Sequence, residues 1–135
     1  MSREVIAPAG QPPPFGVWSP AIAVPAGRLL FVSGLTARLP DGSVTGLGDV
    51  AAQTRQVCAN LDAVLRAAGG TLSDVASVTV YVVDIAGFDR IHAVRREYFP
   101  TDPPASAMVE VSRLVDPRCL IEISAIAVLV QEVST

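Results

Sequence analysis

The chain has 135 residues, of which half are apolar and 17% are charged, and its formal net charge is −3. These values predict a single domain over residues 1–135 and exclude an intrinsically disordered chain. The mild acidity argues against a nucleic-acid binder, and no apolar run matches a transmembrane helix or a signal peptide. We therefore expect a soluble cytoplasmic protein without a membrane or nucleic-acid partner.

Three residue types narrow the chemistry. The chain has no lysine, which excludes Schiff-base catalysis and a phosphate-loop lysine. Its single histidine is His92, and its two cysteines, Cys58 and Cys119, lie far apart in apolar runs. This composition argues against a zinc site and does not suggest a disulfide.

The N-terminal third is predicted to be irregular and then extended. Residues 1–16 are rich in Pro and Gly, so we expect an irregular arm with at most a short edge strand near Val5. Two strands are predicted over residues 21–24 and 28–33, on either side of a turn at residues 25–27.

Two helices are predicted farther along the chain. The first covers residues 50–68, with Asp49 as its N-cap and Gly69 at its end, because apolar residues recur there at gaps of three and four. The second covers residues 86–99 and ends at Pro100. Arg95 and Arg96 are interpreted as part of its solvated face.

The remaining strands are predicted over residues 75–83, 107–111 and 119–130. The order β-β-α-β-α-β-β favours a two-layer α+β sandwich with a mixed sheet of five or six strands and both helices on one face.

The last strand is apolar on both of its faces. Ile121 and Ile123 begin one face, whereas Ile126 and Val128 lie on the other. Two helices cover only one face of a sheet, so the second apolar face predicts an oligomer. The alternative is that the proline-rich arm of residues 1–16 covers that face.

Short motifs are spread along much of the chain, namely Ser33-Gly34, Ala51 to Gln56, Asn60-Leu61, Ala67 to Gly70, Pro104-Ala105, Val109 to Val111, Ile121 to Ile123 and Ala125 to Ala127. Together these motifs resemble the RidA/YjgF or reactive-intermediate deaminase family, and the likeness spans residues 15–130. The resemblance implies a chorismate-mutase-like fold, a homotrimer and small-molecule clefts between subunits. It also implies hydrolysis of imines or enamines with no metal and no cofactor.

The chain departs from the family pattern at the expected binding site. Ser106 stands where active deaminases carry an arginine that holds the substrate carboxylate bidentately. Met108 replaces a common cysteine, and Trp18 stands at a tyrosine position. We therefore expect a substrate that is less anionic than a simple 2-imino acid, unless Arg113 or Arg118 supplies the cation.

The other site residues implied by the resemblance are present. Glu122 matches the glutamate that positions the attacking water, Ser33 and Gly34 match the strand end that lines the cleft, and His92 stands at an asparagine position facing the pocket. Each has a structural alternative. Glu122 would instead pair with an arginine across a subunit interface, and His92 would serve only in packing.

The remaining binding residues have structural alternatives too. Trp18 is either a lid over a planar ligand or core packing for the arm. Ser106 either donates a hydrogen bond to the ligand or fills space, and Met108 is either a pocket wall or core. A Ser106 nucleophile would require His92 as its base.

Three functions follow from these observations. The first is a deaminase-type hydrolase of an imine or enamine. The second is a non-catalytic trimeric protein that binds a small metabolite or regulates a partner. A ribonuclease, an activity sometimes attached to this family, is the least supported, because the chain is acidic, lacks lysine and has one histidine.

Overall fold

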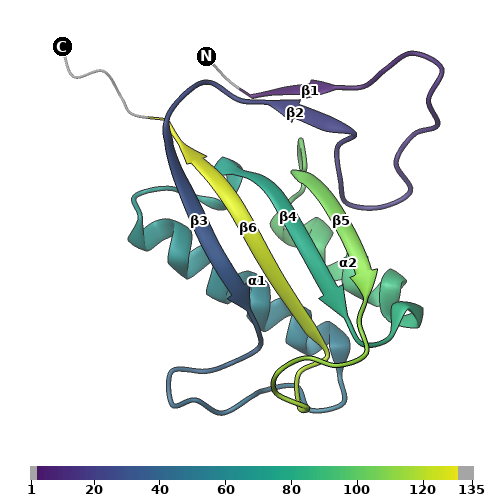
Figure 1. Ribbon diagram of the computed structural model, residues 1–135, viewed down its shortest axis with the longest axis vertical. Coiled ribbons are helices and arrows are strands. Elements are labelled where there is room, and N and C mark those ends of the chain that lie inside the picture. The colour runs from purple at the N-terminus through teal and green to yellow at the C-terminus, as the bar shows by residue number, and fades with distance from the viewer. Residues whose placement is uncertain (1–2, 131–135) are drawn as a thin grey trace.

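The computed structural model describes residues 3–130, which form six strands and two α-helices (Figure 1). Their order confirms the predicted succession, and short 3₁₀ turns precede β4 and α2. The elements are β1 Glu4–Ile6, β2 Ala21–Ala23, β3 Arg28–Leu35, α1 Val50–Ala67, β4 Val75–Val82, α2 Phe88–Tyr98, β5 Ala105–Glu110 and β6 Ile121–Leu129.

Helix α1 begins at the predicted residue and ends one residue before the predicted end, because both of its ends carry strong local signals. The Asp49 carboxylate accepts a hydrogen bond from the Ala52 amide at 3.1 Å, which satisfies one free N–H of the first turn. Gly69 has a φ of 84°, a left-handed conformation that favours glycine and ends the helix. Between these ends, Val57, Leu61 and their neighbours on the same stripe are buried.

Helix α2 begins two residues later than predicted. Ile85–Gly87 form a 3₁₀ turn, in which the Asp84 side chain accepts a hydrogen bond from the Ala86 amide at 2.9 Å. This local cap holds the chain out of the α-helical geometry until Phe88.

The main sheet has four strands in the order β3-β6-β4-β5. Only β4 and β5 are parallel, so the predicted mixed sheet is confirmed. The prediction of five or six strands in one sheet is wrong, because β1 and β2 pair with each other in a separate ribbon. Pro20 and Pro25 flank β2, and a residue without an N–H cannot extend the ladder.

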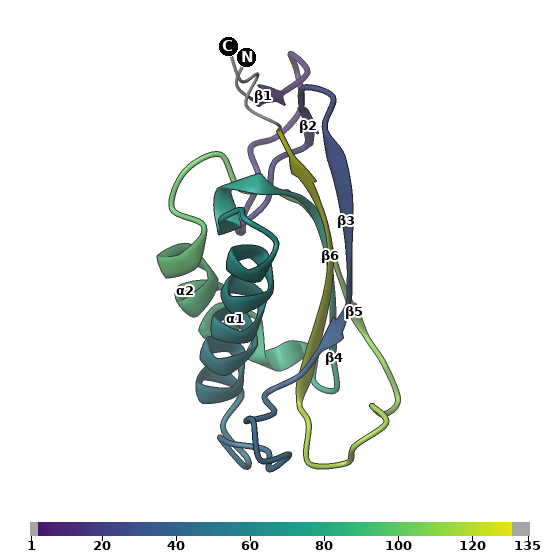
Figure 2. The same ribbon diagram turned by 90° about the vertical axis from the view of Figure 1, so that its left-hand side faces the viewer.

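Both helices pack on one face of the main sheet, which confirms the two-layer sandwich (Figure 2). On that face Val78 and Val80 of β4 and Ile121 and Ile123 of β6 are buried in the core. Cys58 and Cys119 are also buried, and both are free thiols.

The opposite face, here called the open face, carries exposed apolar residues, namely Leu29, Phe31, Val109 and Ile126. Leu29 is 61% exposed and Phe31 is 71% exposed. The described part of the arm lies at one end of the sheet and on its helix-covered side (Figure 2), where Phe15 contacts Phe88 of α2, so the alternative that it covers the open face is wrong. The open face therefore remains uncovered by the described chain.

No helix within residues 3–130 combines the length and apolar character that a membrane span requires.

Candidate functional site

Glu122 lies on β6, against an irregular part of β3. The pairing of β3 with β6 shifts register between Val32 and Leu35, so Ser33 and Gly34 form a bulge. A methyl group added at Gly34 would overlap the Glu122 carboxylate. The bulge and the missing side chain at Gly34 thus make room for this carboxylate, an arrangement typical of functional sites.

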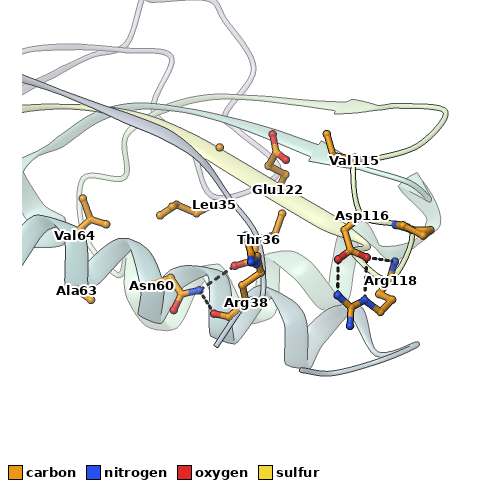
Figure 3. Close-up of a pocket in the computed structure, with 12 residues that line it drawn as sticks. Leu35, Thr36, Arg38, Asn60, Ala63, Val64, Val115, Asp116, Arg118 and Glu122 are labelled. Carbon is orange, nitrogen blue, oxygen red and sulfur yellow. Dashed lines mark hydrogen bonds and ion pairs between the residues drawn. The ribbon is translucent and has the colours of Figure 1, made fainter. Parts of the chain in front are cut away.

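The carboxylate borders an open groove of about 920 Å³ that also includes residues of α1 and of the loop before β6 (Figure 3). Glu122 pairs in register with Tyr81 of β4 and is half-buried on the open face. It makes no ion pair within residues 3–130. We call this cavity the Glu122 groove.

Two amides of α1 hold the walls of the Glu122 groove. The Asn60 side chain donates to the carbonyls of Thr36 and Arg38, each at 2.9 Å (Figure 3). Buried Gln53 donates to the Arg118 carbonyl at 2.9 Å and accepts from the Leu120 amide at 2.7 Å. Both residues lie in the motifs that carry the family resemblance, but sequence reasoning assigned them no role.

Neither arginine suggested from sequence lies near Ser106. Arg118 borders the Glu122 groove and is held by Asp116 at 2.7 Å (Figure 3). Hydrogen bonds from Arg118 lower the pKa of Asp116 to about 2. Arg113 is exposed on the loop between β5 and β6. It lines neither this groove nor the cavity that contains Ser106, which is described next.

A second cavity, of about 330 Å³, lies between α2, β5 and the segment before β2. We call it the aromatic pocket. It brings together four of the predicted site residues with aromatic and apolar neighbours. Its lining residues are Phe15, Trp18, Ile85, Phe88, His92, Arg95, Ser106 and Met108.

The rings of the aromatic pocket are fixed against one another. His92 stacks on Phe88 with ring centroids 3.8 Å apart, and Trp18 meets Phe15 edge-on at 4.6 Å. The His92 Nδ1 atom lies 3.0 Å from the Phe88 carbonyl, so Nδ1 carries the proton in the neutral ring. Burial lowers the pKa of His92, and Arg95 and Arg96 lower it further, which favours that neutral form.

The prediction that Arg95 is solvated is wrong, whereas Arg96 is exposed as predicted. Arg95 is 1% exposed, because it shares the inward helix face with Ile91 and His92, four and three residues earlier. Its Nη2 atom donates to the Val17 carbonyl and to the Ser106 hydroxyl, each at 3.1 Å. Burial lowers the pKa of Arg95 to about 10, so the guanidinium remains charged at neutral pH.

The two cavities cannot form one site within a single chain. Ser106 and Met108 pair with Val78 and Val80, so they share the helix-covered face, whereas Glu122 lies on the open face. Strand β4 lies between β6 and β5, so these two strands are roughly 10 Å apart. The structure thus divides the predicted site residues between two separate cavities, except for Ser33, which lines neither of them.

Within residues 3–130 no group of three or more His, Cys, Asp or Glu side chains is arranged to hold a metal ion. The donors available to a ligand are therefore the carboxylate, imidazole, hydroxyl and guanidinium groups described above.

The fold and the two cavities define a class of two-layer α+β proteins with a four-stranded mixed sheet and a cavity toward each sheet edge. Within that class, the family model for Endoribonuclease L-PSP matches residues 9–129. The chain therefore belongs to this family, which is the RidA/YjgF family indicated by its motifs.

Individual relatives are similar over nearly their whole length. A RutC family protein of Pyrococcus horikoshii is 45% identical over 93% of this chain and 97% of its own. The 3-aminoacrylate deaminase RutC of Acinetobacter baylyi is 39% identical over 94% of this chain and 98% of its own. The crystal structure of YyfB from Yersinia pestis, a Rid family protein of unknown function, matches with a TM-score of 0.88. It is 41% identical and covers 96% of this chain and 100% of its own.

Proposed function

We propose that the protein is a cofactor-independent, deaminase-type hydrolase of an imine or enamine metabolite. Its active site forms between copies of the chain, where the Glu122 groove of one copy meets the aromatic pocket of the next. The observation that carries this proposal is the separation of Glu122 and Ser106 on opposite faces of the sheet. A ring of subunits in head-to-tail contact joins two such half-sites.

The open face supports assembly into the homotrimer that the family resemblance implies. Leu29 and Phe31 of β3 are among its most exposed apolar residues. A sheet face with exposed residues of this size is typical of an interface between subunits. Packing of open faces around an axis would also bring the edge strands of neighbouring copies together.

In the proposed reaction, Glu122 acts as a general base and then as a general acid. Its carboxylate accepts a proton from the water that attacks the C=N carbon, and a C–O bond forms. The proton passes to the nitrogen, which gives a carbinolamine. Glu122 then moves the proton of the carbinolamine hydroxyl to the nitrogen, the C–N bond breaks, and ammonia leaves as the C=O bond forms. An enamine substrate first takes up a proton on carbon and becomes the imine.

The residues of the two half-sites have distinct roles in this proposal. Gly34 lines the groove beside Glu122, and Ser33 precedes it in the bulge that makes room for the carboxylate. Trp18, His92, Ser106 and Met108 bind the substrate in the aromatic pocket of the neighbouring copy. The similarity to a 3-aminoacrylate deaminase supports hydrolysis of a C–N bond, while Ser106 argues against simple 2-imino acids as the preferred substrates.

The test is an imine-hydrolysis assay. An amino-acid oxidase generates a panel of 2-imino acids, and semicarbazide traps those that survive. We expect the wild type to accelerate hydrolysis most for imines with large apolar side chains, and Glu122→Gln to reduce the rate by about 100-fold or more. The variant Ser106→Arg should extend activity to small 2-imino acids.

Two results would contradict the proposal. Full activity of Glu122→Gln would show that the Glu122 carboxylate takes no part in the reaction. Tight binding of imine analogues without turnover by either the wild type or Ser106→Arg would favour the non-catalytic metabolite-binding protein instead.

A further inference from the structure

Arg95 is a buried cation without a compensating anion. No carboxylate within residues 3–130 pairs with it, and the three ion pairs of that region involve other arginines. A charge removed from water is strongly unfavourable unless a partner compensates it. Arg95 nevertheless lies in the wall of an open cavity, where a ligand can reach it.

Part of the hydrogen-bonding capacity of Arg95 is unused. A guanidinium has five N–H donors, and in the described chain all of its hydrogen bonds come from Nη2. The Nε atom is buried and has no partner among residues 3–130. The Val17 carbonyl and the Ser106 hydroxyl thus fix one end of the fork and leave its other donors for a bound group.

The position of the cation explains why position 106 does not need a charge. The Arg95 guanidinium contacts the Ser106 hydroxyl at 3.1 Å, so it reaches from α2 to the point on β5 where the family resemblance places an arginine. A long side chain at position 106 would compete with Arg95 for this space. The serine therefore accommodates Arg95 and also accepts one of its hydrogen bonds.

We propose that Arg95 is the anion-binding residue of the aromatic pocket, and that the pocket binds a carboxylate whose remaining body is planar and apolar. Arginine matches a carboxylate bidentately. The other walls are the rings of Phe15, Trp18 and Phe88 together with Ile85 and Met108, which favour an aromatic or otherwise apolar body. The substrate is thus an apolar imino or enamino acid rather than an uncharged one. This assignment rests on the proposed function for the reaction, whereas the binding step is tested without turnover.

The binding test uses Trp18, the chain's only tryptophan, whose indole lines the pocket. Trp18 fluorescence is followed while the full-length protein is titrated with phenylacetate, with its neutral counterpart phenylacetamide, and with inorganic phosphate. We expect phenylacetate to bind at least about tenfold more tightly than either of the others, because only it presents both a carboxylate and a ring.

Variants of two arginines on α2 distinguish the effect of the buried Arg95 cation on binding from the effect of a general loss of positive charge. Arg95→Met should bind phenylacetate and phenylacetamide with similar affinity, and Arg95→Lys should retain part of the preference because it keeps the charge but loses the fork. The matched control is Arg96→Met, which removes the adjacent, exposed arginine and should bind like the wild type.

A thermal unfolding measurement distinguishes a binding residue from a structural one. Removal of an unpaired buried charge should leave the Tm of Arg95→Met equal to or above that of the wild type. A lower Tm together with an unchanged preference for phenylacetate would assign Arg95 to holding Val17 and Ser106 in place, and would overturn the proposal.

Three further results would overturn it. These are equal affinity of the wild type for phenylacetate and phenylacetamide, no response to phenylacetate, and phosphate binding as tight as phenylacetate binding. The outcome is independent of catalysis. A preference for phenylacetate in a protein that hydrolyses no imine would keep Arg95 as the anion-binding residue and reject the proposed hydrolase. Imine hydrolysis by a protein that shows no preference for phenylacetate would support the proposed hydrolase and reject Arg95 as the anion-binding residue.

Discussion

The Glu122 carboxylate lies against the backbone of Gly34, at the bulge where β3 and β6 change register. A side chain at position 34 would occupy the space of that carboxylate. The contact involves the flexible end of Glu122 and not a backbone atom, so the two residues are coupled through the orientation of one side chain.

This coupling predicts that Gly34→Ala impairs function more than stability. The added methyl group should rotate the Glu122 carboxylate away from its position, and misplacement by about 1 Å lowers a rate on the order of 100-fold. The Tm should change little, because the displaced group has room in the groove. Imine hydrolysis and thermal unfolding are the two measurements.

A double variant tests whether the Gly34 effect acts through Glu122. Gly34→Ala combined with Glu122→Gln should be no slower than Glu122→Gln alone, because the carboxylate that the methyl group displaces is already gone. If the double variant instead loses rate by the product of the two single losses, Gly34 acts in a way that does not involve Glu122.

The open face predicts that assembly depends on Phe31. Phe31→Glu places a charge on the open face, and desolvation of that charge in the proposed interface is unfavourable by several kcal/mol per ion. We expect this variant to elute as a smaller species in size-exclusion chromatography with light scattering. Leu47→Glu is the control, since Leu47 is 65% exposed in the loop before α1 and lies outside the open face. Wild-type mass for Phe31→Glu would place the interface elsewhere.

Buried His92 predicts a stability change in mildly acidic solution. Burial lowers its pKa, so the folded chain binds the proton less readily than the unfolded chain, in which the value is near 6.5. Stability contributed by the neutral ring should therefore be fully present above about pH 6.5 and decrease as the pH falls below it. The nearby charges of Arg95 and Arg96 act in the same direction, and that of Asp89 opposes them.

The variant His92→Asn removes the titrating group and should flatten the dependence of Tm on pH between about 5 and 6.5. Thermal unfolding of both proteins across pH 5–8 gives the comparison. An equally steep decrease in the variant would assign the acid sensitivity to other groups.

Much of the fold could be predicted because its signals are local. Asp49 and Gly69 define α1, and alternating valines define β4. The pairing of β1 with β2 depends on where the proline-rich arm returns, a long-range contact that no local pattern encodes. Arg95 was missed for a similar reason. An arginine on an amphipathic helix is usually solvated, and the burial of Arg95 depends on Ser106 of the next strand and on Val17, which lies 78 residues away in sequence.

The candidate site was only partly predictable. The family motifs identified Glu122 and Ser106, but they could not show that the two residues lie on opposite faces of the sheet in one chain. That conclusion requires the strand order, which follows from pairing between segments far apart in sequence.

Subunit complementation tests the shared active site most directly. Glu122→Gln and Met108→Trp each inactivate one half-site, and each homo-oligomer is first checked for wild-type size and Tm. The two proteins are unfolded together in equal amounts, refolded, and assayed on the imine that the wild type hydrolyses fastest. In a randomly mixed trimer with sites between neighbours, about a quarter of wild-type activity should return, because every hybrid has one intact cleft. A mixture no more active than its parents would contradict a site shared between subunits.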